Sequence, residues 1–318
     1  MREVVAPNVA SARVETQRLA FALKSLARTA GARDVEPSRS AWKRVALAWR
    51  KASAFRAGPM VENNALLRAT FAPIRGNVIE RELTGTRRID GTLLSELGAG
   101  AKGVFALEYL LFEASEGGSV PVTAEGARGE RARSLAEALS AELESYAEGI
   151  GRGLGEQGEL FGPKFASTMQ QSMSSLVSQL VENVETLLTS RYQLLLAMEP
   201  AQALRPSDLE GLRSRMSHEL AQALLSGTEK LYRGGESGAL AALVRQTAPD
   251  VARRVNTRFD EALRSVRAIR EPLERAVLMQ RTAVEAVASR LRTLERALKL
   301  ELGAALGVTL TFTSFDGD

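Results

Sequence analysis

The sequence predicts an all-α protein made of two tandem domains that resemble four-helix bundles. Three observations favour this fold. Apolar residues recur at helical spacing through most of the chain, turn-forming residues separate about four major helices in each half, and only the segment 308–312 (VTLTF) has the character of a strand. A chain of 318 residues is long for one hydrophobic core and sufficient for two.

Two long helices are expected to open the first half. The first, over about residues 8–30, is predicted by leucines spaced three and four residues apart. The second restarts after Pro37 and carries Trp42 and Trp49, which are seven residues apart and therefore lie on the same side of a helix. Core packing is the simpler interpretation of this tryptophan pair, and the wall of a binding site is the alternative.

Between residues 60 and 90 the helical pattern is weak. Asparagine, proline and glycine recur there, and the stretch ends with a charged run that contains Arg87 and Arg88. We expect one short helix followed by an irregular loop. Long structured loops beside a core helix are often functional, and this loop leads directly into the segment 99–113.

The segment 99–113 (AGAKGVFALEYLLFE) combines a long apolar run, three aromatic residues and the carboxylate of Glu108 on one short predicted helix. On a core helix, Glu108 would be a charge removed from water. Such a group normally has a partner, a shifted pKa or a chemical task. The preceding loop offers Arg75, Arg87 and Arg88 as partners, and the alternative is that this loop only caps the helix.

A dense glycine series separates the two predicted domains. It begins at Gly149, at the end of a helix over about residues 127–150, and continues to Gly158. Glycine at this density costs too much backbone entropy to lie inside a helix. We therefore assign residues 1–155 to an N-terminal bundle and residues 156–318 to a C-terminal bundle.

Four further helices are expected in the second half, at about residues 163–198, 207–232, 240–269 and from 272 onward. The second of them begins with a capping box, in which Glu210 follows Ser207 at a distance of three residues. The third is expected to kink at Pro249.

Composition excludes several classes of function. The net charge of +4 reflects a small excess of scattered basic residues, so no nucleic-acid partner is expected. The absence of cysteine excludes disulfides, thiolate metal sites and a cysteine nucleophile. No apolar run approaches the roughly 20 residues of a membrane-spanning helix. The opening MREVVAPNVASARVE lacks the apolar core of a signal peptide, and we expect any signal or lipid anchor of the precursor to be absent from this chain.

Common catalytic motifs are incomplete. GAGAKG at 98–103 and GLGEQG at 153–158 fit the dinucleotide-binding glycine pattern, but neither follows a predicted strand. The single histidine, His218, has Gln222 where a zinc-peptidase helix needs its second histidine. The serine-hydrolase pattern G-x-S-x-G is absent. A metal site would therefore depend on carboxylates, which suit hard cations such as calcium or ferric iron.

Three separated stretches resemble motifs of the imelysin family. They are the segment 42–59 with its two tryptophans, KGVFALEYLL at 102–111, and the terminal LGVTLTFTSFDGD at 306–318. One position departs from the family pattern. Phe105 stands where the family's His-x-x-Glu motif has histidine, whereas Glu108 keeps the place of the carboxylate.

This resemblance implies two four-helix-bundle-like domains in a protein of the bacterial periplasm or outer membrane, often lipid-anchored. It also implies a link to iron-regulated uptake and a site between the domains around the His-x-x-Glu pair. The founding members were called insulin-cleaving metallopeptidases. Iron or another divalent cation is the ligand that the resemblance suggests, with Glu108 as its ligating carboxylate, and no other cofactor is indicated.

We favour a non-enzymatic binding or accessory protein whose partner is a small ligand, a metal ion or another envelope protein. One alternative is a metal-dependent peptidase or hydrolase that uses Glu108 with carboxylates of the last residues. The other is a degenerate scaffold in which Phe105 repacks an abandoned metal site. The candidate site residues are Glu108, Phe105, Lys102, Tyr109, Trp42, Trp49, Arg75, Arg87, Arg88, Asp316 and Asp318.

Overall fold

Helices make up nearly all of the chain that the structure describes, and no strand occurs among those residues. The structure is a computed structural model. It describes residues 2–28, 34–56, 64–112, 120–154, 169–198, 209–235 and 240–308. The expected all-α fold is confirmed. The segment 308–312, which was expected to be extended, lies outside the described residues apart from Val308.

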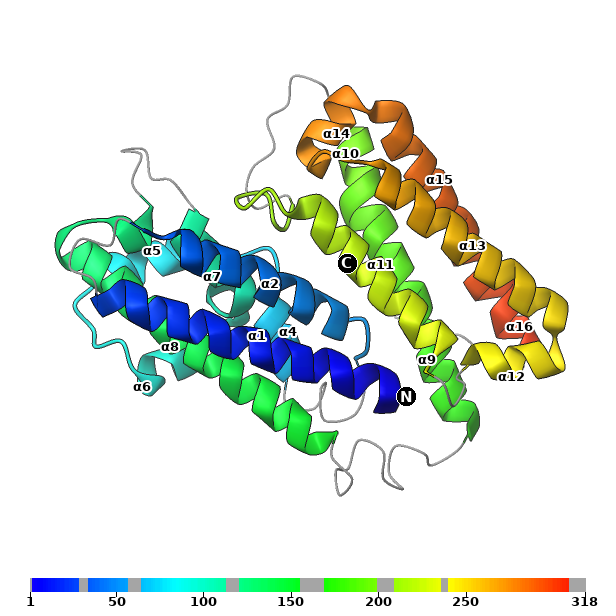
Figure 1. Ribbon diagram of the computed structural model, residues 1–318, viewed down its shortest axis with the longest axis horizontal. Helices are drawn as coiled ribbons and strands as arrows, with labels where there is room; N and C mark the ends of the chain where they lie inside the picture. Colours follow the sequence, from blue (N-terminus) through cyan, green and yellow to red (C-terminus); the bar gives the residue numbers. More distant parts are fainter. Residues whose placement is uncertain are drawn as a thin grey trace, which may run out of the picture.

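The first half of the chain forms one group of helices. They are α1 (Arg2–Arg28), α2 (Glu36–Ala52), α4 (Ala65–Thr70), α5 (Gly76–Thr84), α6 (Gly91–Glu96), α7 (Gly103–Phe112) and α8 (Gly126–Gly153). The long helix α1 packs along α2 and α8, and α7 lies against both α2 and α8 (Figure 1). Because α7 is enclosed by its neighbours, nine of its ten residues are buried.

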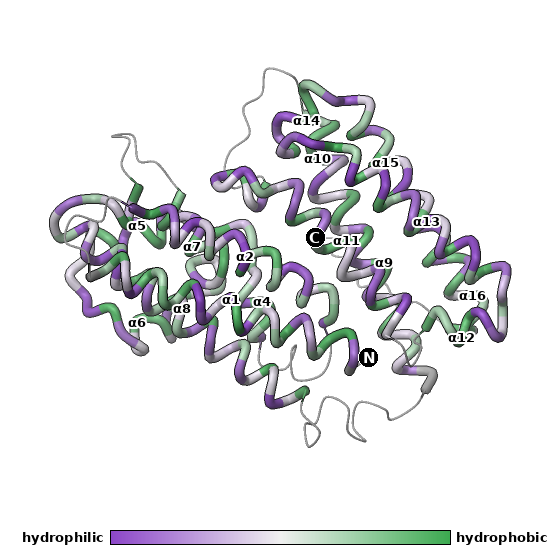
Figure 2. Tube along the Cα trace, in the orientation of Figure 1, coloured by the Kyte–Doolittle hydropathy of each residue, from purple (hydrophilic) through white to green (hydrophobic). Residues whose placement is uncertain are grey.

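The second half forms another group of helices. They are α9 (Met169–Leu187), the π-helical turn η4 (Leu188–Gln193), α10 (Leu194–Ala197), α11 (Ser217–Arg233), α12 (Leu240–Thr247), α13 (Pro249–Ala268), α14 (Leu273–Met279), α15 (Arg281–Arg296), the π-helical turn η5 (Ala297–Leu302) and α16 (Gly303–Ala305). Helix α9 contacts α11 and α15, and α13 contacts α11 and α15. Figure 2 shows hydrophobic and hydrophilic residues interleaved along α13 and α15, as expected for helices with one buried face.

Within the described residues, no helix is both long and apolar enough to cross a bilayer. This agrees with the sequence, which contains no apolar run of the required length. The assignment of residues 1–155 and 156–318 to separate domains stays a prediction, and its boundary falls at the start of the undescribed range 155–168.

Helix α2 joins the two groups by packing against α11. The contact is close at Gly227 of α11, where an added Cβ would lie 2.8 Å from the carbonyl oxygen of Lys51 and 2.9 Å from the Cβ of Ala54. A residue with a side chain would therefore push the two helices apart. Glycine at this position allows the two groups to approach each other.

Gly227→Ala is expected to lower the free energy of unfolding by about 1–3 kcal/mol, the usual cost of overpacking. Chemical denaturation measures the change. The matched control is Gly149→Ala in α8, because a Cβ at Gly149 meets no atom within 4 Å. Its higher helix propensity should raise the stability by about 0.5–1 kcal/mol. An equal loss in both variants would contradict a specific role for the contact between α2 and α11.

Three local expectations were wrong. The glycine series does not end the helix near 150, because α8 continues to Gly153 while Ala147, Ile150 and Leu154 bury one of its sides. The stretch 60–90 holds two short helices, α4 and α5, instead of one. At Pro249 the expected kink is a break between α12 and α13, with Pro249 as the first residue of α13.

The predicted capping box was also wrong. Helix α11 begins at Ser217, and residues 209–215 form turns, while Ser207 lies outside the described residues. Glu210 is buried instead of capping a helix, because its carboxylate pairs with two arginines from other parts of the chain.

Candidate functional site

A pocket of about 500 Å³ lies where the two groups of helices meet. Its apolar lining includes Phe105 of α7 and Leu194 of α10. The π-helical turn η4 contributes three residues to the lining, Thr189, Ser190 and Arg191, and π-helical turns frequently occur at functional sites. Among the described residues, the charged ones that line the pocket are Arg50 of α2, Glu108 of α7, Arg191 of η4, and Glu210 and Arg213 of the turn segment 209–216.

Gly103 explains how α7 reaches this position. Its φ of 73° is in the left-handed region, and a Cβ there would lie 2.3 Å from the carbonyl oxygen of Arg68. Only glycine fits this close approach to α4. The chain turns at Gly103 and enters the core as α7, which brings Phe105 and Glu108 to the pocket.

Glu108 is 2% exposed, and Ser214 of the second half donates two hydrogen bonds to it. Its Oε1 accepts hydrogen bonds from the backbone N–H of Ser214 at 2.9 Å and from the Ser214 hydroxyl at 2.7 Å. Burial raises the pKa of Glu108 to about 7, although the Ser214 hydrogen bonds and the nearby Arg213 charge act in the opposite direction. Glu108 therefore changes its protonation state close to neutral pH.

A buried ion-pair cluster stands beside Glu108. Glu210 Oε1 lies 2.7 Å from Nη2 of Arg191, and Glu210 Oε2 pairs with Nη2 of Arg50. The side chains of all three residues are at least 89% buried. Burial lowers the pKa of Arg50, and Arg191 adds to this effect, whereas Glu210 opposes it. One carboxylate thus neutralises two guanidinium groups only in part.

Phe105 forms the wall of the pocket next to Arg50. The guanidinium carbon of Arg50 lies 5.4 Å from the centre of the Phe105 ring, which is within the range of a cation–π contact. A phenyl ring can neither ligate a metal nor accept a proton. The contribution of Phe105 is therefore to pack against a cation and to cover part of the pocket with apolar surface.

The sequence and the structure were compared with those of known proteins. Residues 5–299 match the family model of imelysins, or peptidase family M75. The chain belongs to the imelysin family. The resemblance inferred from the sequence motifs is thereby confirmed. Among curated proteins, none matches the sequence.

Two solved structures share the fold of this imelysin-family chain. An imelysin-like protein from Psychrobacter arcticum 273-4 is 19% identical, with a TM-score of 0.72 over 97% of this chain and 93% of that one. A protein assigned as an iron-regulated protein A precursor from Parabacteroides distasonis ATCC 8503 is 16% identical, with a TM-score of 0.72 over 96% of this chain and 91% of that one. Identities this low establish likeness of fold.

Several candidate residues of this imelysin-family chain stabilise the core outside the pocket lining. Trp42 donates its Nε1–H to the carbonyl oxygen of Val104 at 2.7 Å, and Trp49 donates to the hydroxyl of Thr16 at 3.0 Å. Both rings are buried, as the simpler interpretation of the tryptophan pair predicted. Lys102 is also buried, and its Nζ lies 2.7 Å from Glu142 Oε1.

Tyr109 lies next to the pocket and does not line it. The guanidinium of Arg213 stands 5.2 Å from the centre of the Tyr109 ring. The Tyr109 hydroxyl donates a hydrogen bond of 2.6 Å to Glu80 Oε1, which also accepts from Arg128 at 2.9 Å. Tyr109 therefore helps to orient Arg213, which is a pocket residue.

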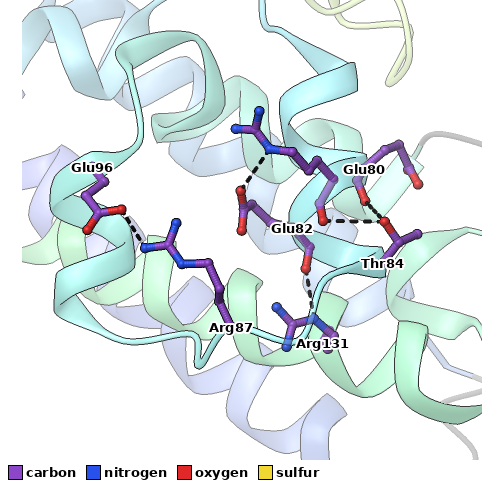
Figure 3. A network of polar contacts seen from close by, with 7 residues as sticks. Glu80, Glu82, Thr84, Arg87, Glu96 and Arg131 are labelled. Atoms are coloured by element: carbon purple, nitrogen blue, oxygen red, sulfur yellow. Dashed lines mark hydrogen bonds and ion pairs between the residues drawn. The ribbon is translucent and has the colours of Figure 1, made fainter.

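The expected pairing of Glu108 with the preceding loop was wrong. Arg87 pairs with Glu96 at the surface (Figure 3), and Arg88 lies 4.0 Å from Asp90 with 89% of its side chain exposed. The backbone N–H of Arg75 donates a hydrogen bond to the carbonyl oxygen of Gly100, in the segment that precedes α7. None of these three arginines lines the pocket. Asp316 and Asp318 lie outside the described residues.

The sequence did not point to Arg50, Arg191, Glu210, Arg213 or Ser214. These residues come from three distant segments, and Arg50 and Glu210 are 160 positions apart. No local spacing could have indicated that their side chains meet.

Carboxylates and the histidine do not form a metal cage in the part of the chain that the structure describes. No group of three or more His, Cys, Asp or Glu side chains is close enough together there to hold a metal ion. His218 on α11 is 6% exposed, does not line the pocket, and has a pKa lowered by burial. Within those residues, Glu108 and Glu210 are the two carboxylates at the pocket, and Glu210 is engaged by arginines.

Proposed function

We propose that this imelysin-family chain is a non-enzymatic binding protein of a bacterial envelope and that it holds a small ligand in the pocket beside Glu108. The observation that carries this proposal is the pocket of about 500 Å³ between the two groups of helices, with the nearly fully buried carboxyl of Glu108 in its lining. A volume of this size is typical of small-molecule sites, and a carboxyl with a strongly raised pKa inside a pocket is typical of a functional group.

A role in iron acquisition is part of this proposal. It is supported by family membership and by the name of one similar structure, an iron-regulated protein A precursor. A place in the periplasm or at the outer membrane, with a lipid anchor on the precursor, is also part of this proposal and is supported by the same family membership. Iron or another divalent cation bound at Glu108 is a second candidate ligand, and an envelope protein that receives the ligand is a candidate partner.

A metal-dependent peptidase is the alternative function. The family model carries a peptidase name, and a carboxyl with a pKa of about 7 suits a general base. Phe105, however, leaves the motif without its imidazole, and His218 stands elsewhere on α11. A scaffold that has lost its ligand is the third candidate, and it is supported by the packing of Phe105 on Arg50.

Thermal unfolding in the presence of a defined panel tests the proposed function. The panel contains ferrous, ferric, zinc and calcium ions, neutral sugars, amino acids, citrate and inorganic phosphate. We expect at least one compound to raise the melting temperature of the wild type and to lose this effect in Ser190→Trp. Ser190 is an exposed residue at the pocket, so a tryptophan there fills the entrance without disturbing the core.

The matched control is Ser289→Trp, because Ser289 is also exposed, on α15, and does not line the pocket. A panel in which no compound stabilises the wild type would favour the scaffold. Stabilisation that persists in Ser190→Trp would place binding outside this pocket. Hydrolysis of a peptide library that a chelator abolishes would instead favour the peptidase.

A further inference from the structure

We propose that the ligand of this pocket is a small oxyanion, which binds through its carboxylate or phosphate oxygens to the guanidinium groups of Arg50, Arg191 and Arg213. This inference rests on the proposed function, because it names the chemical class of ligand for the same pocket.

The charge of the pocket lining favours an anion. Among the residues that the structure describes, three guanidinium groups and two carboxylates line the pocket, which leaves an excess of one positive charge, or of two when Glu108 is protonated. Arginine keeps its charge at any physiological pH. The side chains of Arg50 and Arg191 are 11% and 10% exposed, so solvent screens their charge only weakly. This part of the lining therefore attracts an anion more strongly than a cation.

Hydrogen-bond donors in the lining point to the same conclusion. Nε of Arg50 and Nε of Arg191 have no hydrogen-bond partner among the described residues, but both atoms are out of contact with solvent, as is Oε1 of Glu210, which also has no hydrogen bond. A ligand in the pocket can therefore reach these two side chains only through their other guanidinium nitrogens. Carboxylate and phosphate groups present several acceptor oxygens at the spacing of the guanidinium fork. An oxyanion would therefore find matching donors on the guanidinium groups that line the pocket.

The arrangement holds these donors in place before a ligand arrives. Glu210 fixes one edge of Arg50 and one edge of Arg191, and Phe105 covers the face of Arg50. Arg213 stacks on Tyr109, whose hydroxyl is in turn anchored on Glu80. A ligand thus meets guanidinium groups that have already lost much of their freedom, which reduces the entropic cost of binding.

The uncharged residues that line the pocket fit a small, compact ligand. Thr186 and Ser190 line the same pocket and add hydroxyl groups that can donate to a further oxygen, whereas the Thr189 hydroxyl already donates to the carbonyl oxygen of Glu185 at 2.8 Å. The Phe105 ring and Ile74 bound the pocket with apolar surface. A volume of about 500 Å³ admits an organic acid of a few carbons or a phosphorylated small molecule.

Isothermal titration of the full chain in an anion-poor HEPES buffer tests this inference, with citrate and inorganic phosphate as the two probes. We expect one of them to bind, and the tighter of the two identifies carboxylate or phosphate as the preferred group. Arg213→Gln should weaken binding about tenfold or more, the loss typical of a charge-assisted hydrogen bond. Arg215→Gln is the matched control, since Arg215 is exposed two positions away and does not line the pocket.

Ser190→Trp provides a second variant, because it blocks the pocket without touching an ion pair. Binding that Arg213→Gln and Ser190→Trp both weaken, and that Arg215→Gln leaves nearly unchanged, supports the inference. The absence of binding by either anion would overturn it, and so would an equal loss in Arg213→Gln and Arg215→Gln. A third outcome separates this inference from the proposed function. If neither anion binds, and a neutral compound or a metal ion from the panel binds to the wild type but not to Ser190→Trp, the pocket is a binding site whose ligand is not an oxyanion. The proposed function would then stand, and the inference about the ligand class would be wrong.

Discussion

Glu210→Gln is expected to destabilise the protein by about 3–5 kcal/mol, the usual cost of removing one partner from a buried ion pair. Glu210 is the shared counter-ion of Arg50 and Arg191, and its side chain is 2% exposed. The variant would leave two guanidinium groups side by side in a poorly solvated place. Because Arg50 lies on α2 and Arg191 on η4, the repulsion would act directly at the junction of the two groups of helices.

Urea denaturation of the wild type and the variant measures this loss. Glu96→Gln is the control, because it removes the same charge from the exposed pair with Arg87 in Figure 3, and it should leave the stability within experimental error. The triple replacement of Arg50, Arg191 and Glu210 by methionine should cost less than Glu210→Gln, since no uncompensated charge stays behind. A single Glu210→Gln change that costs as little as Glu96→Gln would show that the cluster is well solvated.

The sequence indicated the fold because the fold depends on regular spacing. Trp42 and Trp49, seven residues apart, are on the buried side of α2, and the apolar run around Glu108 is a buried helix. Each of these features is local, and a helix buries whichever of its faces is apolar. The burial of Glu108 could be predicted for the same reason, since its neighbours on every side of α7 are apolar.

The partners of Glu108 could not be predicted, because they depend on how distant segments meet. Ser214, which holds Glu108, is 106 positions away, and the sequence offered nearer candidates in Arg75, Arg87 and Arg88. Glu210 was assigned to a capping box from a sound local pattern. That carboxylate forms tertiary ion pairs with Arg50 and Arg191 instead of a hydrogen bond at the start of a helix. The chain forms turns at 209–215, where the capping box predicted a helix.

The glycine series shows the same competition at a smaller scale. Glycine propensity predicts a helix end near Gly149, at a cost of about 1 kcal/mol for each glycine kept in the helix. Burial of Ile150 and Leu154 offsets that cost, because one buried leucine or isoleucine contributes about 1.5–3 kcal/mol. The sequence pattern therefore predicted that α8 is a helix, whereas the packing of its last residues determines where it ends.

Glu108→Gln is expected to stabilise the protein at alkaline pH and to have little effect at acidic pH. The pKa of Glu108 is about 7 in the folded protein, whereas the ordinary value is 4.5. Between these two pH values the folded state holds a proton that the unfolded state has released. The contribution of Glu108 to stability is thus fully present below pH 4.5, decreases as the pH rises, and is lost above pH 7, a total change of roughly 3 kcal/mol.

Glutamine is neutral at every pH, and its carbonyl oxygen can still accept both hydrogen bonds from Ser214. The difference in unfolding free energy between Glu108→Gln and the wild type should therefore grow in favour of the variant from pH 5 to pH 8. Urea denaturation at several pH values measures this difference, and Glu285→Gln on the exposed surface of α15 serves as the control. A difference that stays constant over this range would mean that Glu108 titrates alike in the folded and unfolded chains, and that its position beside the pocket costs the fold nothing.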